Sequence, residues 1–191
     1  MVEVQRLRDY TVEWRFISLA VLNEDRVAEW YTPHYRRGHV AGLECLRVAD
    51  AVRLGHGNDG VARLYESLGT MVHNDQRGDD LRADSAAFIR EALGRAGLDE
   101  TLAEHYDNDA HDAHVRAETA VALERAGKDV GTPILTFHPG AADENSFFGP
   151  VIASIPRGDD AVRLWDAIEL IATTSGMAEL KRSLRSRPNF D

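Results

Sequence analysis

The sequence contains a single cysteine, Cys45, among its 191 residues. One thiol cannot form a disulfide within the chain, which excludes the disulfide-rich class of secreted domains and favours the cytoplasm. No apolar run approaches the ~18 residues that a membrane-spanning helix needs. The first residues also lack the basic and then apolar blocks of a signal peptide. We therefore expect a cytoplasmic protein with no membrane partner.

Positive charge is also scarce, with 22 Lys and Arg residues against 32 Asp and Glu residues and a net charge of −10. Such a surface repels nucleic-acid phosphates and anionic lipids, so we expect no nucleic-acid partner. The hydrophobic content of 43% and charged content of 28% are those of an ordinary globular protein. The length suits one domain, or one domain with an insertion, around a substantial core.

The two ends of the chain carry the pattern of an α/β protein. Residues 2–8 resemble the last turns of a helix, and the alternation of apolar residues over 12–20 predicts a strand that becomes buried on both faces. Near the other end, "TPILTFHP" and "SFFGPVIASI" predict two further strands. A helix is expected to begin near Gly158, where two acidic residues favour a helix N-terminus, and a last helix over 177–185.

The middle of the chain, from Glu29 to Gly127, has helical periodicity almost throughout. Asp84 and Asp99 stand where helix caps are expected. "GHGNDG" fits a glycine-rich dinucleotide motif, but it follows a helical stripe and not a strand, so it predicts a helix–helix loop. The expected core positions of this block are Val40, Leu43, Leu46, Val48, Val52, Val61, Leu64, Leu68, Met71, Val72, Phe88, Ile89 and Leu93.

These elements predict two structural parts. Residues 1–28 and 128–191 would form one α/β domain, interrupted by an inserted helical domain over 29–127. From the end of the first helix onward, the order matches a thioredoxin fold with a helical insertion.

Several segments carry a more specific resemblance: "SLAVLNEDR", "VHNDQ", "VGTPILTF", "FFGPVIASIPRGDDAVRLWD" and the C-terminal "ELKRSLRSRPNFD". Together they resemble the actinobacterial mycothiol-dependent nitroreductase family, in the DsbA-like branch of the thioredoxin superfamily. The resemblance implies a cytosolic thiol-disulfide oxidoreductase with no bound cofactor and with mycothiol as electron donor. Its implied partners are a low-molecular-weight thiol and a disulfide or nitro-type small molecule, and a homodimer is left open.

The motif that carries the family's chemistry is not in this sequence. The resemblance implies a Cys-Pro-Trp-Cys motif after a first strand, ahead of the helix that ends at residues 2–8. The reaction needs a thiolate at a helix N-terminus and a second thiol one turn on. Cys45 lies in an apolar helical stripe and is expected to be an inert buried thiol. No catalytic residue is therefore expected in this chain.

The first strand of such a sheet would lie between the strands expected at 12–20 and 133–138. Without it, both would lose a neighbour, and each unpaired buried backbone group costs about 1–3 kcal/mol. We therefore expect either that the natural protein is longer than the sequence beginning at Met1, by roughly thirty residues, or that a rearranged sheet or a partner fills the gap. The first explanation is favoured because it needs only one change.

The resemblance also implies a substrate-binding site. Thr132 and Pro133 match the family's cis-proline loop, which would offer main-chain hydrogen bonds to a thiol substrate; the alternative is a trans proline at an ordinary strand entry. Asn23, Tyr35 and the pair His73-Asn74 match positions expected to line the cleft. Their alternatives are a turn or cap residue for Asn23, a helix-packing ring for Tyr35 and a core histidine for His73.

One more cluster points to different chemistry. Two histidines at i and i+3 beside carboxylates can hold a divalent cation, although the acidic density also fits a solvated surface and no metal site is expected. The residues are His105, Asp107, Asp109, His111, Asp112 and His114.

Three hypotheses follow: a mycothiol-linked reductase whose thiol pair is not in this chain, a redox-inactive binding protein for a thiol or small aromatic ligand, and a metal-holding helical protein.

Overall fold

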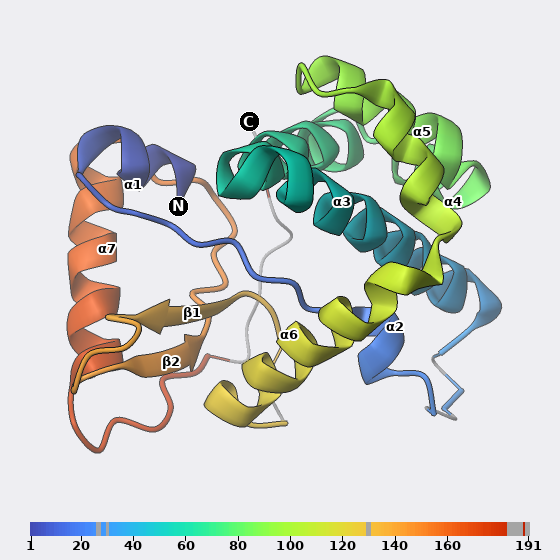
Figure 1. The fold of residues 1–191 in the computed structure, drawn as a ribbon. Helices are drawn as coiled ribbons and strands as arrows, with labels where there is room; N and C mark the ends of the chain where they lie inside the picture. The colour runs from blue at the N-terminus through green and yellow to red at the C-terminus, as the bar shows by residue number, and fades with distance from the viewer. Residues whose placement is uncertain (26–27, 30, 129–130, 183–188, 190–191) are drawn as a thin grey trace. The chain divides into compact units, whose positions relative to one another are not determined.

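The computed structural model describes residues 1–25, 28–29, 31–128, 131–182 and 189. It is a mixed α/β structure that divides into two compact units (Figure 1). The first unit contains residues 1–12 and 122–191, and the second contains residues 13–121. The division into domains at residues 29–127 that the sequence predicted stays a prediction. That the first unit belongs to a thioredoxin-like domain stays a prediction.

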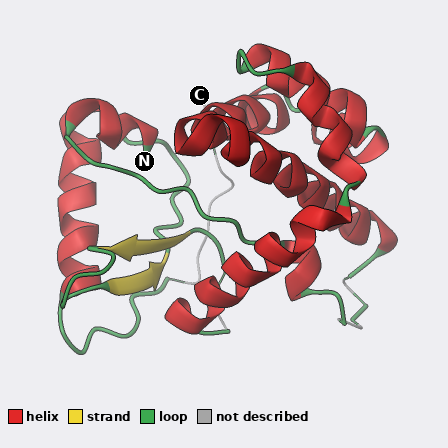
Figure 2. Cartoon of the chain, in the orientation of Figure 1, coloured by secondary structure: helices red, strands yellow, loops and turns green. Residues whose placement is uncertain are grey.

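The elements of the described residues are mostly helical (Figure 2). In chain order they are α1 Val2–Leu7, α2 Leu19–Leu22, α3 Pro33–Gly69, the π-helix η1 Thr70–Asn74, α4 Gly78–Ala83, α5 Ser85–Arg95, the 3-10 helices η2 Glu100–Asp107 and η3 Asp109–His111, α6 Asp112–Ala126, β1 Ile134–Phe137, β2 Asn145–Phe148 and α7 Gly158–Thr173.

The second unit is built on α3, which is bent at Gly57. The backbone there has φ of 63° and ψ of −162°, a conformation open to glycine because it has no Cβ atom. Two helical arms therefore meet directly at this residue, within the segment predicted to be a helix–helix loop. The junction between two helices is present, but it is a bend at one residue and not a loop.

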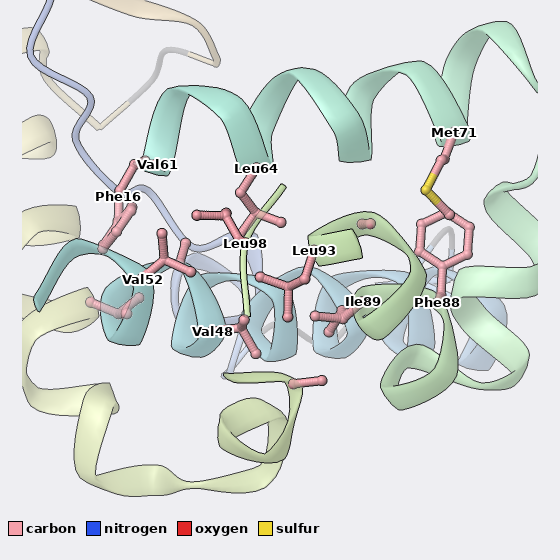
Figure 3. Packing of buried hydrophobic residues seen from close by; sticks show 14 residues of the cluster. Phe16, Val48, Val52, Val61, Leu64, Met71, Phe88, Ile89, Leu93 and Leu98 are labelled. Atoms are coloured by element: carbon pink, nitrogen blue, oxygen red, sulfur yellow. The ribbon is translucent and has the colours of Figure 1, made fainter. Parts of the chain in front are cut away.

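The core of the second unit lies between these arms, α5 and η2 (Figure 3). Val48 and Val52 from the first arm, Leu64 from the second and Leu93 from α5 are almost fully buried, as their helical spacing predicted. Val40 is the exception, since 39% of its surface is exposed. The carboxylates of Asp84 and Asp99 accept hydrogen bonds from the N–H groups of Ala87 and Thr101, which confirms both caps.

The strand expected over 12–20 is wrong. Residues 13–18 lie outside any strand, and α2 begins at Leu19. The N–H groups of Trp14, Phe16 and Ser18 donate instead to the side chains of Asn58, Glu118 and Thr119, at 2.8, 2.7 and 3.0 Å. The predicted alternation corresponds to an extended chain, in which every second N–H group points to the same edge. The acceptors on that edge are helical side chains and not a neighbouring strand.

The first unit contains an antiparallel hairpin of β1 and β2, the only strands of the described residues. Ile134 lies opposite Phe148 and Phe137 opposite Asn145. This confirms both predicted strands, although the second ends at Phe148 and does not reach residue 155.

Helix α7 packs against α1 and the hairpin, and it begins at Gly158 as predicted. The Gly158 N–H donates to Glu3 of α1 at 3.0 Å, and Asn145 of β2 donates to the Ala172 carbonyl at 2.7 Å.

The helix expected over 177–185 is wrong for residues 177–182, which have no helical structure, and its last residues lie outside those described. The sequence after α7 has few apolar residues to bury, so packing offers it little stabilisation.

Within the described part of the chain, every helix is too short or too polar to cross a lipid bilayer.

Candidate functional site

Thr132 and Pro133 lie immediately before β1 in the first unit, and both are exposed. The peptide bond between them is cis. The Pro133 carbonyl accepts a hydrogen bond from Gly149 at 2.8 Å, which extends the hairpin ladder by one pair. The two residues are thus held by the hairpin while their side chains stay accessible to solvent.

Asn23 and Tyr35 belong to the second unit. Asn23 ends α2, and its side-chain amide donates to the Leu19 carbonyl at 2.8 Å. This is the capping role that was the alternative to cleft lining. Tyr35 stands in the first turn of α3 with 55% of its surface exposed. Its ring is therefore not a packing element of the core.

His73 and Asn74 end the π-helix η1, which directly follows α3. Both are exposed, so His73 is not a core histidine. Single π-helical turns are often found at functional sites, and this one contains the buried Met71. The predicted residues of the second unit therefore come from α2, α3 and η1. That they line one cleft with Thr132 and Pro133 stays a prediction.

Cys45 lies in the first arm of α3 and packs against the hydrophobic core. Burial raises the pKa of its thiol to about 12, and the carboxylate of Glu44 adds to the rise. Nucleophilic attack requires the thiolate, whose fraction at neutral pH would be about one in 10⁵ at such a pKa. This thiol does not fit the role of a nucleophilic cysteine.

We expect the folded protein to leave Cys45 unmodified by a thiol reagent such as dithionitrobenzoate at pH 7. In urea above the unfolding transition the same thiol should react at least a hundredfold faster, because unfolding removes the burial that raises its pKa. Absorbance at 412 nm measures both rates. Equal rates in the two conditions would mean that the thiol is accessible in the folded state.

A buried polar network links α3 to η3 and α6. Asp50, which is 5% exposed, accepts hydrogen bonds from the Nδ1 atoms of His111 at 2.8 Å and His114 at 2.5 Å. The Nε2 atom of His111 lies 2.8 Å from Nδ1 of His105. Burial alone would raise the pKa of Asp50, but the hydrogen bonds from His111 and His114 outweigh it and lower that pKa. The sequence identified the histidines but not Asp50, their common partner.

These short contacts are hydrogen bonds between neighbours and not a set of ligands around one point. Among the residues that the structure describes, no group of three or more His, Cys, Asp or Glu side chains is arranged to hold a metal ion.

Glu118 continues the network and holds the extended segment 13–18. One carboxylate oxygen accepts from Arg53 at 2.7 Å and from Arg15 at 2.8 Å, and the other accepts from the Phe16 N–H at 2.7 Å. Burial would raise the pKa of Glu118, but these hydrogen bonds together lower it. The guanidinium of Arg53 also lies 3.8 Å from the centroid of the Phe16 ring.

The two units thus define a mixed α/β protein with a helical unit, a hairpin–helix unit and one free thiol, Cys45. Residues 1–182 match the Rv2466c-like family, which is described as mycothiol-dependent nitroreductase Rv2466c. Because the match spans nearly the whole chain, the protein belongs to this family.

Proposed function

We propose that this chain is part of a mycothiol-dependent reductase that acts on disulfide or nitro-type substrates. The observation that carries the proposal is the family match over residues 1–182. The proposal extends to a DsbA-like thioredoxin fold in which residues 29–127 are the helical insertion. A low-molecular-weight thiol is then the physiological partner.

The thiol pair of this reaction lies outside residues 1–191 in our proposal. In thiol–disulfide exchange a thiolate attacks a disulfide sulfur, the old S–S bond breaks and releases another thiolate, and a second thiol resolves the mixed disulfide. The chain has one cysteine, and burial raises its pKa to about 12. What these residues contribute is therefore substrate binding, with Thr132 and Pro133 offering main-chain groups and Asn23, Tyr35, His73 and Asn74 lining the cleft.

The 191-residue chain is expected to show no reduction of a nitroaromatic or a disulfide by mycothiol above the uncatalysed rate. The native protein, isolated from its own cells, is expected to reduce the same substrate and to have an intact mass above the 21.2 kDa of this chain. Mass spectrometry and a coupled mycothiol-oxidation assay measure both. A native mass equal to 21.2 kDa with no turnover would overturn the proposal, and ligand binding without turnover would then favour a redox-inactive binding protein.

The binding role has its own test in the active native protein. His73→Ala is expected to lower kcat/KM by roughly five- to tenfold, the effect of losing one hydrogen-bonding group. His56→Ala is the matched control, since His56 is an exposed histidine further along α3 and is not among the proposed cleft residues. Equal activity of the two variants would remove His73 from the proposed cleft.

A further inference from the structure

His138 stands directly after β1, where the chain leaves the hairpin ladder. Its φ angle is 50°, in the left-handed region that few residues other than glycine adopt. The loop that it begins, residues 138–144, is closed by hydrogen bonds from Ala141 N–H to the His138 carbonyl at 2.9 Å and from Glu144 N–H to the Ala141 carbonyl at 3.1 Å. His138 is therefore both the first residue of the loop and part of its backbone hydrogen bonding.

Both nitrogens of the His138 ring face carboxylates. Nδ1 lies 2.8 Å from Asp143 in the same loop, and Nε2 lies 2.9 Å from Glu169 on α7. A neutral imidazole carries one N–H and can donate to only one of them, whereas the imidazolium donates to both. Both contacts are therefore hydrogen bonds to ionised carboxylates only when the ring is protonated. Loss of that proton leaves one nitrogen lone pair facing a carboxylate.

The surroundings of the ring favour its positive charge. Glu169 also accepts a hydrogen bond from the Tyr10 hydroxyl at 2.9 Å, and the Tyr10 ring packs on Trp165. Asp166 on the same helix pairs with Arg8, and Glu144 of the loop pairs with Arg125. The charged groups that act on His138 are the two carboxylates that it bridges, Glu169 and Asp143.

We propose that the protonated ring of His138 holds the β1–β2 loop on helix α7, and that the loop is released when the ring loses its proton. One nitrogen of the imidazolium donates to Asp143 within the loop, and the other donates to Glu169 on the helix. Release leaves the β-ladder intact, since the ladder does not depend on the His138 side chain. The protonation state of His138 therefore changes how well ordered the loop is and leaves the fold of the unit unchanged.

The direction of the pH dependence follows from these contacts. Hydrogen bonds to Glu169 and Asp143 raise the pKa of His138 above its ordinary value. A group whose folded pKa is raised contributes its stabilisation fully below the unfolded value, about 6.5. That contribution is lost as the pH rises through the higher folded value. The loop is therefore held in mildly acidic solution and released as the pH rises through the folded pKa.

The test is amide hydrogen exchange of the full chain by NMR between pH 5.5 and 8.5, expressed as protection factors so that intrinsic exchange cancels. Protection of the Ala141 and Glu144 amides should fall by roughly two- to fivefold over this range, the factor expected for one partly exposed ion pair. In His138→Asn, which tolerates the left-handed backbone but does not titrate, the protection should not change with pH.

Two further variants keep the proposal falsifiable. In Glu169→Gln the fall in protection should move to lower pH, because one of the two carboxylates that favour the imidazolium is gone. His34→Gln, an exposed histidine of α3, should respond as the parent protein does. The proposal is overturned by constant protection in the parent protein, or by a pH response that persists unchanged in His138→Asn.

Discussion

Replacing Glu118 with alanine is expected to lower the free energy of unfolding of the helical unit by about 3–5 kcal/mol, the usual cost of leaving one partner of a buried ion pair alone. Glu118 has a 5% exposed side chain and accepts hydrogen bonds from Arg53, Arg15 and the Phe16 N–H. The variant leaves the Arg53 guanidinium, whose side chain is only 20% exposed, without its nearest carboxylate. It also leaves the buried Phe16 N–H without an acceptor.

Such a loss is a large share of the ~5–15 kcal/mol that stabilises a typical domain. For a unit of about 100 residues the midpoint of thermal unfolding should fall on the order of 20 °C. Circular dichroism at 222 nm during heating measures this shift. Glu124→Ala, an exposed glutamate near the end of the same helix, is the control and should stay within about 0.5 kcal/mol of the parent protein. Similar midpoints for the two variants would show that the Glu118 contacts stabilise little.

The helical unit was predictable because its signals are local. Apolar residues three and four apart, such as Val48 and Val52, become buried whenever a helix packs on a core, and Asp84 caps its helix through a residue three positions on. The hairpin was predictable for the same reason, since β1 and β2 are short apolar segments separated by a polar loop.

The segment 13–18 shows where local signals are insufficient. Its alternation describes an extended chain with one buried face, and Phe16 is buried as that pattern requires. What pairs with its backbone is decided by residues about 40 and 100 positions away, namely Asn58 and Glu118. The periodicity of apolar residues does not reveal that the acceptors are side chains, so the extended segment was interpreted as a strand.

The candidate site likewise contains residues that the sequence identified and residues that it did not. Thr132, Pro133 and His73 were identified through the family resemblance, and the structure places them at exposed positions. The buried carboxylates Asp50 and Glu118 were not identified, because an acidic residue in a helix is normally solvent-exposed. Only the tertiary structure shows which cationic or N–H groups surround them.

The second large effect is expected at Asp50. Asp50→Ala should lower the free energy of unfolding by about 2–4 kcal/mol at pH 7, since hydrogen bonds to a charged group contribute about 1.5–3 kcal/mol each and are not additive here. The variant removes the acceptor shared by His111 and His114, and so the link between α3 and the start of α6. Because His111 is itself buried, water cannot easily replace the lost carboxylate.

The pH dependence of this loss of stability shows whether it comes from the negative charge of Asp50 or from the packing of its side chain. Hydrogen bonds from both histidines lower the pKa of Asp50 in the folded state. Its contribution is therefore complete above the unfolded value of about 3.9 and is lost as the pH falls through the lower folded value. In urea unfolding, the difference between the parent protein and the closely isosteric Asp50→Asn should persist at pH 5–7 and shrink below about pH 4.

Asp59→Asn provides the control for this comparison, since Asp59 is an exposed carboxylate on the same helix. It should behave as the parent protein at every pH. A difference between parent and Asp50→Asn that does not shrink on acidification would mean that side-chain packing, and not the charge of Asp50, holds the two helices together. If it does shrink, the negative charge shared by His111 and His114 fixes the position of α6 on α3, and with it the position of Glu118.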